Sequence, residues 1–237
     1  MSSESVEQEA ILWRLEEQAP RYNAWLLERT LPHLGETVLE VGAGIGTFTL
    51  KLAADHRVER VVALEPDDAL AATLAHRTRA FANVHVRRER VEHLTPELAG
   101  GLFDSVICFN VLEHIHDDRN ALRGIAECLR SGGSLFLLSP AHPLLFGEID
   151  RAVHHQRRYR RAPLGRLLAE CGFHVETIRY VNPVGVFGWL VSSRLLKLRN
   201  IPSSSLRLYE HLVPALKVLD RARLPFGLSV WARAVRS

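Results

Sequence analysis

Apolar and polar positions follow two different periods along the chain. Short apolar runs of the kind that form buried strands begin at Val38 and cover 60–64, 84–88, 103–109, 134–138, 173–181 and 228–235. Between several of these runs, apolar residues recur at three- and four-residue steps, which predicts helices, one of them over 118–130 and stopped by Gly132 and Gly133. Strands that alternate with helices favour an α/β fold with a mostly parallel sheet.

Two predicted helical segments lie outside this alternation. The first covers about 6–29 and repeats Ile11, Leu15 and Trp25 on one face, so it buries that face. The second is 183–225, between the sixth and seventh predicted strands, where two amphipathic stretches also carry basic residues. A helical cap packed on the sheet edge is the simplest interpretation of 183–225. A membrane surface, a hydrophobic acceptor and a dimer partner are the alternatives.

A glycine-rich turn follows the first strand. The stretch VLEVGAGIG contains Gly42, Gly44 and Gly46, whose missing Cβ atoms let the backbone turn sharply and approach a ligand closely. The dinucleotide fingerprint GxGxxG requires a glycine where Thr47 stands, and Glu40 lies inside the strand end. The turn therefore predicts a nucleotide-type cofactor and disfavours a nicotinamide dinucleotide.

The second strand ends on an acid, Glu65, followed by Pro66. In nucleotide-binding α/β folds a carboxylate at this place accepts hydrogen bonds from both ribose hydroxyls. The alternative is a helix cap for the helix that starts near Asp68, but Asp67 and Asp68 can serve that role. Glu65 is therefore the strongest single candidate for a cofactor contact.

The fourth strand, FDSVICF, runs into NVLEHIHDD. Together with the glycine turn and Glu65, this segment resembles the class I S-adenosylmethionine-dependent methyltransferases that act on small molecules, of the type 11 and type 12 kinds. The resemblance implies a Rossmann-like, seven-stranded, mostly parallel sheet in a three-layer α/β/α sandwich, with strands six and seven paired antiparallel at one edge. It also implies S-adenosylmethionine as the cofactor and S-adenosylhomocysteine as the product.

The family pattern assigns further roles, residue by residue. The glycine turn, including Ala43, would wrap the amino-acid end of the cofactor, and Glu40 would interact with that end. The backbone at Val91 would meet the adenine. The Asn110 carbonyl would meet the cofactor's ammonium, and Val111 would line the wall. The resemblance also makes the amino-terminal helix a lid and places His114 near the acceptor.

The acceptor site is expected after the fifth strand, because ligands of open α/β sheets bind beyond the carboxyl ends of the strands. Two arginines there, Arg157 and Arg158, are suited to pair with a carboxylate or phosphate. A neutral histidine is the natural proton acceptor near pH 7. The candidates for catalysis are His114, His142, His154, His155 and Tyr159. Tyr22 from the lid and Trp189 from 183–225 are further candidates for substrate binding.

Composition is consistent with a single domain of 237 residues, 47% hydrophobic and 24% charged. We divide it into a lid over 1–34, a core over 35–182, an insertion over 183–225 and a last strand over 226–237. The acidic, polar amino terminus does not resemble a secretory signal, so a cytoplasmic location is expected. No transmembrane span is predicted, because no stretch approaches an uninterrupted apolar run of about 20 residues. No metal site is predicted, because the three cysteines and twelve histidines lack recognised ligand spacings.

The function predicted from the sequence is O-, N- or C-methylation of a small molecule that is anionic or hydrophobic. A nucleic-acid methyltransferase is disfavoured, because the net charge is only +3 and FNVL stands where such enzymes carry an NPPY-like tetrapeptide. An NAD(P)-dependent oxidoreductase and a non-catalytic cofactor-binding scaffold remain as alternatives. Monomer and homodimer are both compatible with the sequence.

Overall fold

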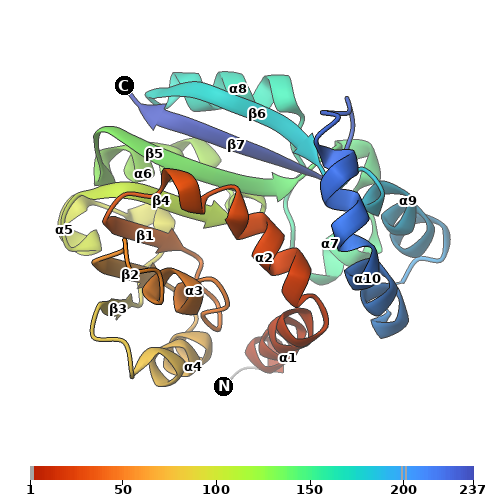
Figure 1. Ribbon diagram of the computed structural model, residues 1–237, viewed down its shortest axis with the longest axis horizontal. Coiled ribbons are helices and arrows are strands. Elements are labelled where there is room, and N and C mark those ends of the chain that lie inside the picture. The colour runs from red at the N-terminus through yellow and green to blue at the C-terminus, as the bar shows by residue number, and fades with distance from the viewer. Residues whose placement is uncertain (1–2, 199, 201) are drawn as a thin grey trace.

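The computed structural model of the protein describes residues 3–198, 200 and 202–237 (Figure 1). Met1, Ser2, Arg199 and Ile201, which the predicted lid and insertion include, lie outside the described residues. Within the described part, seven strands form one sheet in the order β3-β2-β1-β4-β5-β7-β6. Their bounds are β1 Thr37–Val41, β2 Arg60–Leu64, β3 Val84–Arg87, β4 Phe103–Phe109, β5 Leu129–Pro140, β6 Phe173–Val181 and β7 Ser229–Arg236.

Neighbouring strands run parallel except at one edge, where β7 lies antiparallel to both β5 and β6. The central strands are apolar in nearly every position because both of their faces are covered. The predicted fold class is therefore confirmed, including the antiparallel edge.

Helices cover both faces of the sheet (Figure 1). One face carries α5 (Pro96–Ala99), α6 (Asp118–Cys128) and α8 (Arg161–Glu170), packed on the larger apolar core. The other face carries α2 (Pro20–Glu28), α3 (Thr49–Ala53) and α4 (Asp68–Thr78). The remaining short elements are η1 Leu31–His33, η2 Val91–His93, η3 Leu112–His114, η4 Pro143–Leu145 and α7 Glu148–Ala152.

Two predicted helices differ from the observed ones. The helix expected over 6–29 is divided into α1 (Ser3–Gln18) and α2, because Pro20 has no amide proton to continue the first helix and instead starts the second. The helix expected over 118–130 ends at Cys128, and β5 begins at the next residue. Gly132 then lies inside β5, at φ +76°, where the pairing with β4 shifts its register.

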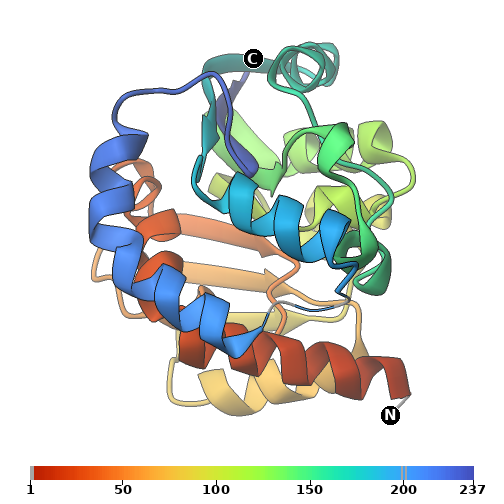
Figure 2. The ribbon, with the colours of Figure 1, turned by 90° about the vertical axis from the view of Figure 1, so that its right-hand side faces the viewer.

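The segment before β7 is helical, as predicted, with α9 (Gly185–Trp189), a π-helical turn η5 (Leu190–Leu195) and α10 (Ser203–Asp220). Helix α10 contacts α1 and α2, and Figure 2 shows it crossing beside α1. Val213 and Leu216 of α10 pack on Trp25. The segment exposes many large apolar side chains, among them Phe187, Val191, Leu195, Leu196, Leu208 and Val218. None of the helices that the structure describes is long and apolar enough to cross a membrane.

Candidate active site

The glycine turn leaves β1 at the carboxyl edge of the sheet. Gly42, Gly44 and Gly46 have φ angles of +72°, +56° and +91°, which residues with a Cβ rarely adopt. A Cβ added to Gly42 would lie 2.3 Å from Val111 Cγ2, so the turn and the segment after β4 approach each other closely here. The turn is held to the neighbouring strand because the Gly42 and Ala43 amides both donate to the Leu64 carbonyl.

Glu65 lies at the end of β2 with only 6% of its surface exposed. Its carboxylate accepts hydrogen bonds from the amides of Gly44 at 2.8 Å and Asp67 at 3.0 Å. Burial raises the pKa of Glu65, and the two amides oppose that effect. Asp67 accepts from the amides of Ala69 and Leu70 and so caps α4, which leaves Glu65 out of that role.

Glu40 is a second buried carboxyl group beside the turn. Thr49 at the start of α3 donates a 2.6 Å hydrogen bond to it. Burial raises the pKa of Glu40 to about 8, opposed by the Thr49 hydrogen bond and reinforced by the nearby Glu65 carboxylate. A cationic cofactor near this group would favour its ionised form.

The raised pKa of Glu40 predicts how stability depends on pH. Protonation of Glu40 stabilises the fold, so its contribution is complete below the ordinary pKa of 4.5 and is lost as pH rises through about 8. Without cofactor, Glu40→Gln should therefore flatten the fall in melting temperature across this window. Glu59→Gln, at an exposed position, is the control and should keep the wild-type slope. An unchanged slope in Glu40→Gln would contradict the assignment.

Helix α1 lies directly over the glycine turn. A Cβ at Gly44 would come within 3.0 Å of Leu12, and Thr47 donates a hydrogen bond to Glu16. Arg77 of α4 pairs with Glu16 and donates to the Ile45 carbonyl at 2.7 Å. These contacts link α1, the turn and α4. That α1 acts as a lid stays a prediction.

The turn after β4 carries the next group of predicted residues. Asn110 has a φ of +54°, and its amide donates to the Leu138 carbonyl of β5 at 2.8 Å. Val91, the predicted adenine contact, is buried at the start of η2. The structure therefore arranges the cofactor candidates along the carboxyl ends of β1, β2 and β4 and the turn after β3.

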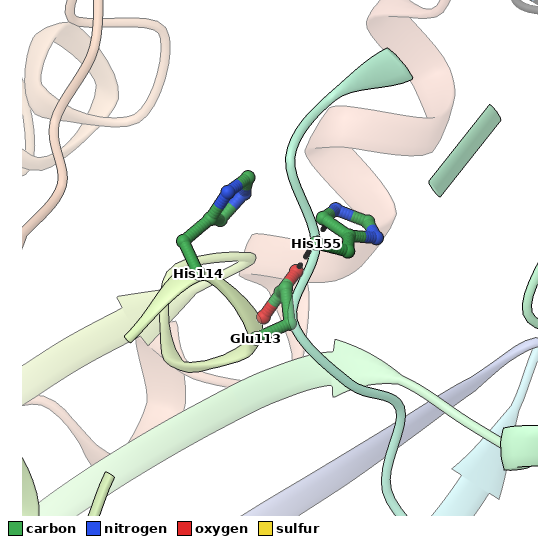
Figure 3. Close-up of side chains that lie close together, drawn as sticks. All are labelled: Glu113, His114 and His155. Carbon is green, nitrogen blue, oxygen red and sulfur yellow. Dashed lines mark ion pairs between the residues drawn. The ribbon is translucent and has the colours of Figure 1, made fainter. Parts of the chain in front are cut away.

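Glu113, His114 and His155 converge beside this turn, as Figure 3 shows. His155 Nε2 lies 3.9 Å from Glu113 Oε1, and the two imidazole centroids are 4.8 Å apart. Burial raises the pKa of Glu113 to about 7, an effect that the nearby His155 opposes. Burial, helped by His155 and His154, lowers the pKa of His114 to about 4. The sequence analysis did not group these three residues, because His155 lies far from Glu113 and His114 along the chain.

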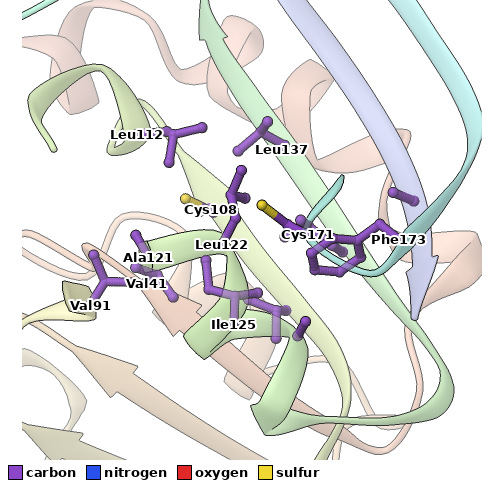
Figure 4. Close-up of a cluster of buried hydrophobic side chains, with 14 of the residues drawn as sticks. Val41, Val91, Cys108, Leu112, Ala121, Leu122, Ile125, Leu137, Cys171 and Phe173 are labelled. Carbon is purple, nitrogen blue, oxygen red and sulfur yellow. The ribbon is translucent and has the colours of Figure 1, made fainter. Parts of the chain in front are cut away.

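The turn is fixed from below by the larger core. Leu112 points into that core with Cys108, Leu122 and Leu137, as drawn in Figure 4. Glu113 is fully buried and accepts a 3.0 Å hydrogen bond from Ser139 of β5. The position of Glu113 and His114 is therefore set by packing and not by a mobile loop.

The predicted acceptor arginines are engaged within the protein. Arg158 has a side chain only 1% exposed, and its Nε donates to Asp150 at 2.8 Å. Its guanidinium also lies 4.4 Å from the centre of the Trp189 ring. Arg157 pairs with Asp118 at 2.9 Å and donates to the His116 carbonyl. These contacts bury the Arg158 guanidinium within the fold, whereas Arg157 is 34% exposed. That the two arginines hold an anionic acceptor stays a prediction, and the geometry favours Arg157 over Arg158 for it.

Other acceptor and catalytic candidates also have structural roles. The Tyr159 hydroxyl lies 2.9 Å from Asp118 and 3.2 Å from the Leu112 carbonyl, so it fastens the turn after β4. His142 stacks on Tyr180 with centroids 4.4 Å apart, away from the pairing of His114 with His155. Tyr22 packs edge-on against Trp25 and Tyr209, and the Trp189 indole donates to the Leu145 carbonyl. His154, at φ +58°, directly precedes His155.

A cavity of about 550 Å³ lies between α1 and α7. Its lining residues are Glu7, Ala10, Ile11, Arg14, Ala152 and Asn200. The Arg14 Nε is buried, and no hydrogen-bond partner for it is found among the described residues. Sequence reasoning missed Arg14, although its place three residues after Ile11 puts it on the buried side of the helix.

The geometry of the turn fits S-adenosylmethionine. Three glycines form a cradle that a Cβ would fill at Gly42, and two buried carboxyl groups, Glu40 and Glu65, lie beside this turn and would complement a cationic ribonucleoside. Thr47 stands where the dinucleotide fingerprint requires its third glycine, and its hydroxyl donates a hydrogen bond to Glu16 of α1. The turn therefore does not match the dinucleotide fingerprint.

Curated proteins with similar sequences are methyltransferases. A ubiquinone biosynthesis O-methyltransferase of Xanthomonas axonopodis pv. citri is 36% identical over 157 residues, which cover 61% of this chain and 65% of that protein. A probable S-adenosylmethionine-dependent methyltransferase of Mycolicibacterium smegmatis is 32% identical over 156 residues, covering 65% of this chain and 56% of that one. The chain thus spans between 56% and 65% of the length of these two relatives.

Solved structures share the fold. The N-methyltransferase NodS from Bradyrhizobium japonicum, in complex with S-adenosylhomocysteine, has a TM-score of 0.65 at 16% identity, covering 98% of this chain and 96% of NodS. The [4+2]-cyclase SpnF has a TM-score of 0.60 at 17% identity, covering 91% and 80% of the two chains. Because a cyclase has this fold too, the fold alone does not define the reaction.

A family model described as a methyltransferase domain matches residues 15–178, more than half of the chain. This match and the curated relatives favour a methyltransferase over the oxidoreductase and scaffold alternatives. The chain belongs to the class I S-adenosylmethionine-dependent methyltransferases, and S-adenosylmethionine is its cofactor.

Proposed function

We propose that the protein methylates an oxygen atom of a small molecule bound in the cavity between α1 and α7. The observation that carries this proposal is the position of the cavity. Ala10 and Ile11 line it, and the next residue, Leu12, lies against Gly44 of the cofactor turn. On the other side it is lined by Ala152, which directly precedes the segment with His154 and His155.

The cavity has a mixed character that suits an acceptor with an apolar body and an acidic or hydroxyl group. Ala10, Ile11 and Ala152 are apolar, whereas Arg14 is a half-buried cation in the cavity wall and suits an acceptor with an anionic oxygen. Oxygen as the methylated atom is supported by the ubiquinone biosynthesis O-methyltransferase that is 36% identical to this chain.

S-adenosylmethionine supplies a methyl group on a sulfonium, which is a good leaving group. The residues of the chain then have to hold the two reactants in line and exclude water, and such positioning alone lowers the barrier substantially. Glu65 and the glycine turn would hold the cofactor, and Arg14 with the cavity wall would orient the acceptor. Helix α1 contributes to both tasks, because Leu12 faces the turn and Ile11 faces the cavity.

Filling the cavity tests this assignment. Ile11→Trp should raise the acceptor KM at least about tenfold, since the indole takes up space that the acceptor needs, and should leave the cofactor Kd within about twofold. The assay is transfer of a labelled methyl group to a panel of hydroxylated aromatic acids and, for comparison, amines. Val6→Trp is the matched control, because Val6 is 49% exposed on the same helix. Methylation of amines alone, or an Ile11→Trp variant with the wild-type KM, would overturn the proposal.

A further inference from the structure

We propose that Glu113, His114 and His155 bind a divalent transition-metal ion. Each residue offers one ligand atom, and the three atoms all lie within 4.8 Å of one another. Ligands about 2.0–2.2 Å from a tetrahedral Zn²⁺ are roughly 3.4 Å apart, so modest side-chain rotations bring this set onto an ion. The three side chains come from the turn after β4 and from the segment after α7, and they point toward one another (Figure 3).

The Glu113 carboxylate lacks a partner for one of its oxygen atoms. Oε2 accepts from Ser139, whereas Oε1 is buried and has no hydrogen-bond partner among the described residues. The 3.9 Å separation from His155 Nε2 is too long for a hydrogen bond. A buried polar atom left unpaired is costly, and a cation between Glu113 and the two imidazoles would satisfy it.

The surroundings of His155 prepare its Nε2 for a metal. Its Nδ1 lies 2.8 Å from Asp150 Oδ1, and Asp150 also accepts from Arg158 Nε and the Gly147 amide, both at 2.8 Å. A carboxylate in an ion pair with arginine only accepts, so Nδ1 donates to Asp150 and Nε2 is the nitrogen turned toward Glu113. Metal-binding histidines almost always donate their second ring N–H to a carboxylate, a backbone carbonyl or a water.

The ligand set indicates the kind of ion. Two imidazoles and one carboxylate suit Zn²⁺, Mn²⁺ or Fe²⁺, whereas Mg²⁺ and Ca²⁺ prefer oxygen ligands. Three protein ligands leave a coordination position open. Glu113 and His114 lie on the same turn as Asn110, where the family resemblance places the acceptor.

The role of the ion in catalysis rests on the proposed function, although its binding does not. A hydroxyl oxygen of the acceptor would take the open position and lose its proton to water more easily. The O–CH₃ bond then forms as the S–CH₃ bond breaks, and the electron pair of that bond stays on sulfur, which becomes the neutral thioether of S-adenosylhomocysteine.

The test is calorimetric titration of the EDTA-treated, dialysed protein with ZnCl₂. We expect one ion per chain, with affinity at least tenfold lower in Glu113→Gln and in His155→Ala. His56→Ala is the control, because that side chain is 93% exposed, and it should bind as wild type does. Zn²⁺ should also raise the melting temperature of the wild type more than that of either site variant. A cooperative melting transition of each variant without metal shows that the variant is folded.

The outcomes separate the two proposals. Absence of Zn²⁺ binding to the wild type, or equal affinity in Glu113→Gln and His155→Ala, overturns the metal site. Titration with S-adenosylmethionine on the same samples reports whether the cofactor turn is intact. If Zn²⁺ binds through Glu113 and no hydroxyl acceptor is methylated with or without it, the metal site stands and the proposed function falls.

Discussion

Glu65→Ala is expected to weaken binding of S-adenosylmethionine by about 10- to 150-fold, because a hydrogen bond to a charged group contributes about 1.5–3 kcal/mol. The carboxylate is buried at the end of β2 and already bonds the Gly44 amide of the cofactor turn. Its loss removes a cofactor partner and also loosens the turn. Isothermal titration with S-adenosylmethionine and S-adenosylhomocysteine measures the effect on both ligands.

The matched control for Glu65→Ala is Asp68→Ala. Asp68 lies three positions further along, and its side chain is 84% exposed in a surface ion pair with Arg88. Such pairs contribute little, so cofactor affinity should stay within about twofold. Cofactor binding by Glu65→Ala at wild-type strength would show that another residue holds the ribose.

Arg158→Ala is expected to lower the free energy of unfolding by about 3–5 kcal/mol, the usual consequence of removing one member of a buried ion pair. Asp150 then keeps the contacts with His155 and the Gly147 amide but loses the arginine charge. Asp150 is fully buried, and Arg158 is its partner at 2.8 Å. The variant also loses a hydrogen bond to the Ala141 carbonyl and the stacking on Trp189. Urea unfolding in EDTA, followed by circular dichroism, measures the change without any metal contribution.

Arg157→Ala is the control for Arg158→Ala. Its partner Asp118 is the same kind of group, but the Arg157 side chain is 34% exposed, so a loss of about 1 kcal/mol or less is expected. The double variant with Asp150→Ala should be less destabilised than the sum of the single changes, because it leaves no unpaired charge. Equal stability of Arg157→Ala and Arg158→Ala would mean that the buried pair is not a structural element.

The strands were predictable because buried parallel strands are continuous apolar runs. Such runs can be located in the sequence without knowing which strands pair. Arg60–Leu64, Phe103–Phe109 and Phe173–Val181 match the predicted bounds. The two helix errors arose where a local signal has two meanings. Pro20 was placed inside a continuous amphipathic pattern, and Gly132 was taken as a helix stop although it serves a register shift in β5.

The cofactor half of the site was more accessible to sequence reasoning than the acceptor half. Glu40, Glu65 and the glycine turn lie at strand ends, and strand ends meet at one edge of a parallel sheet. The orientation of Arg158, in contrast, depends on Asp150 and on Trp189, which come from other elements. Pairings of this kind follow from tertiary packing, and a run of basic residues does not reveal them.

The contacts of α1 have a kinetic consequence. Glu16 joins Thr47 of the cofactor turn to Arg77 of α4, so a cofactor seated against the turn lies beneath a fastened helix. Loosening of the Glu16 contacts is the movement that would open the turn for exchange of S-adenosylhomocysteine and S-adenosylmethionine. We therefore expect the fastened helix to slow the release of the spent cofactor, a conformational step of the kind that limits turnover in many enzymes.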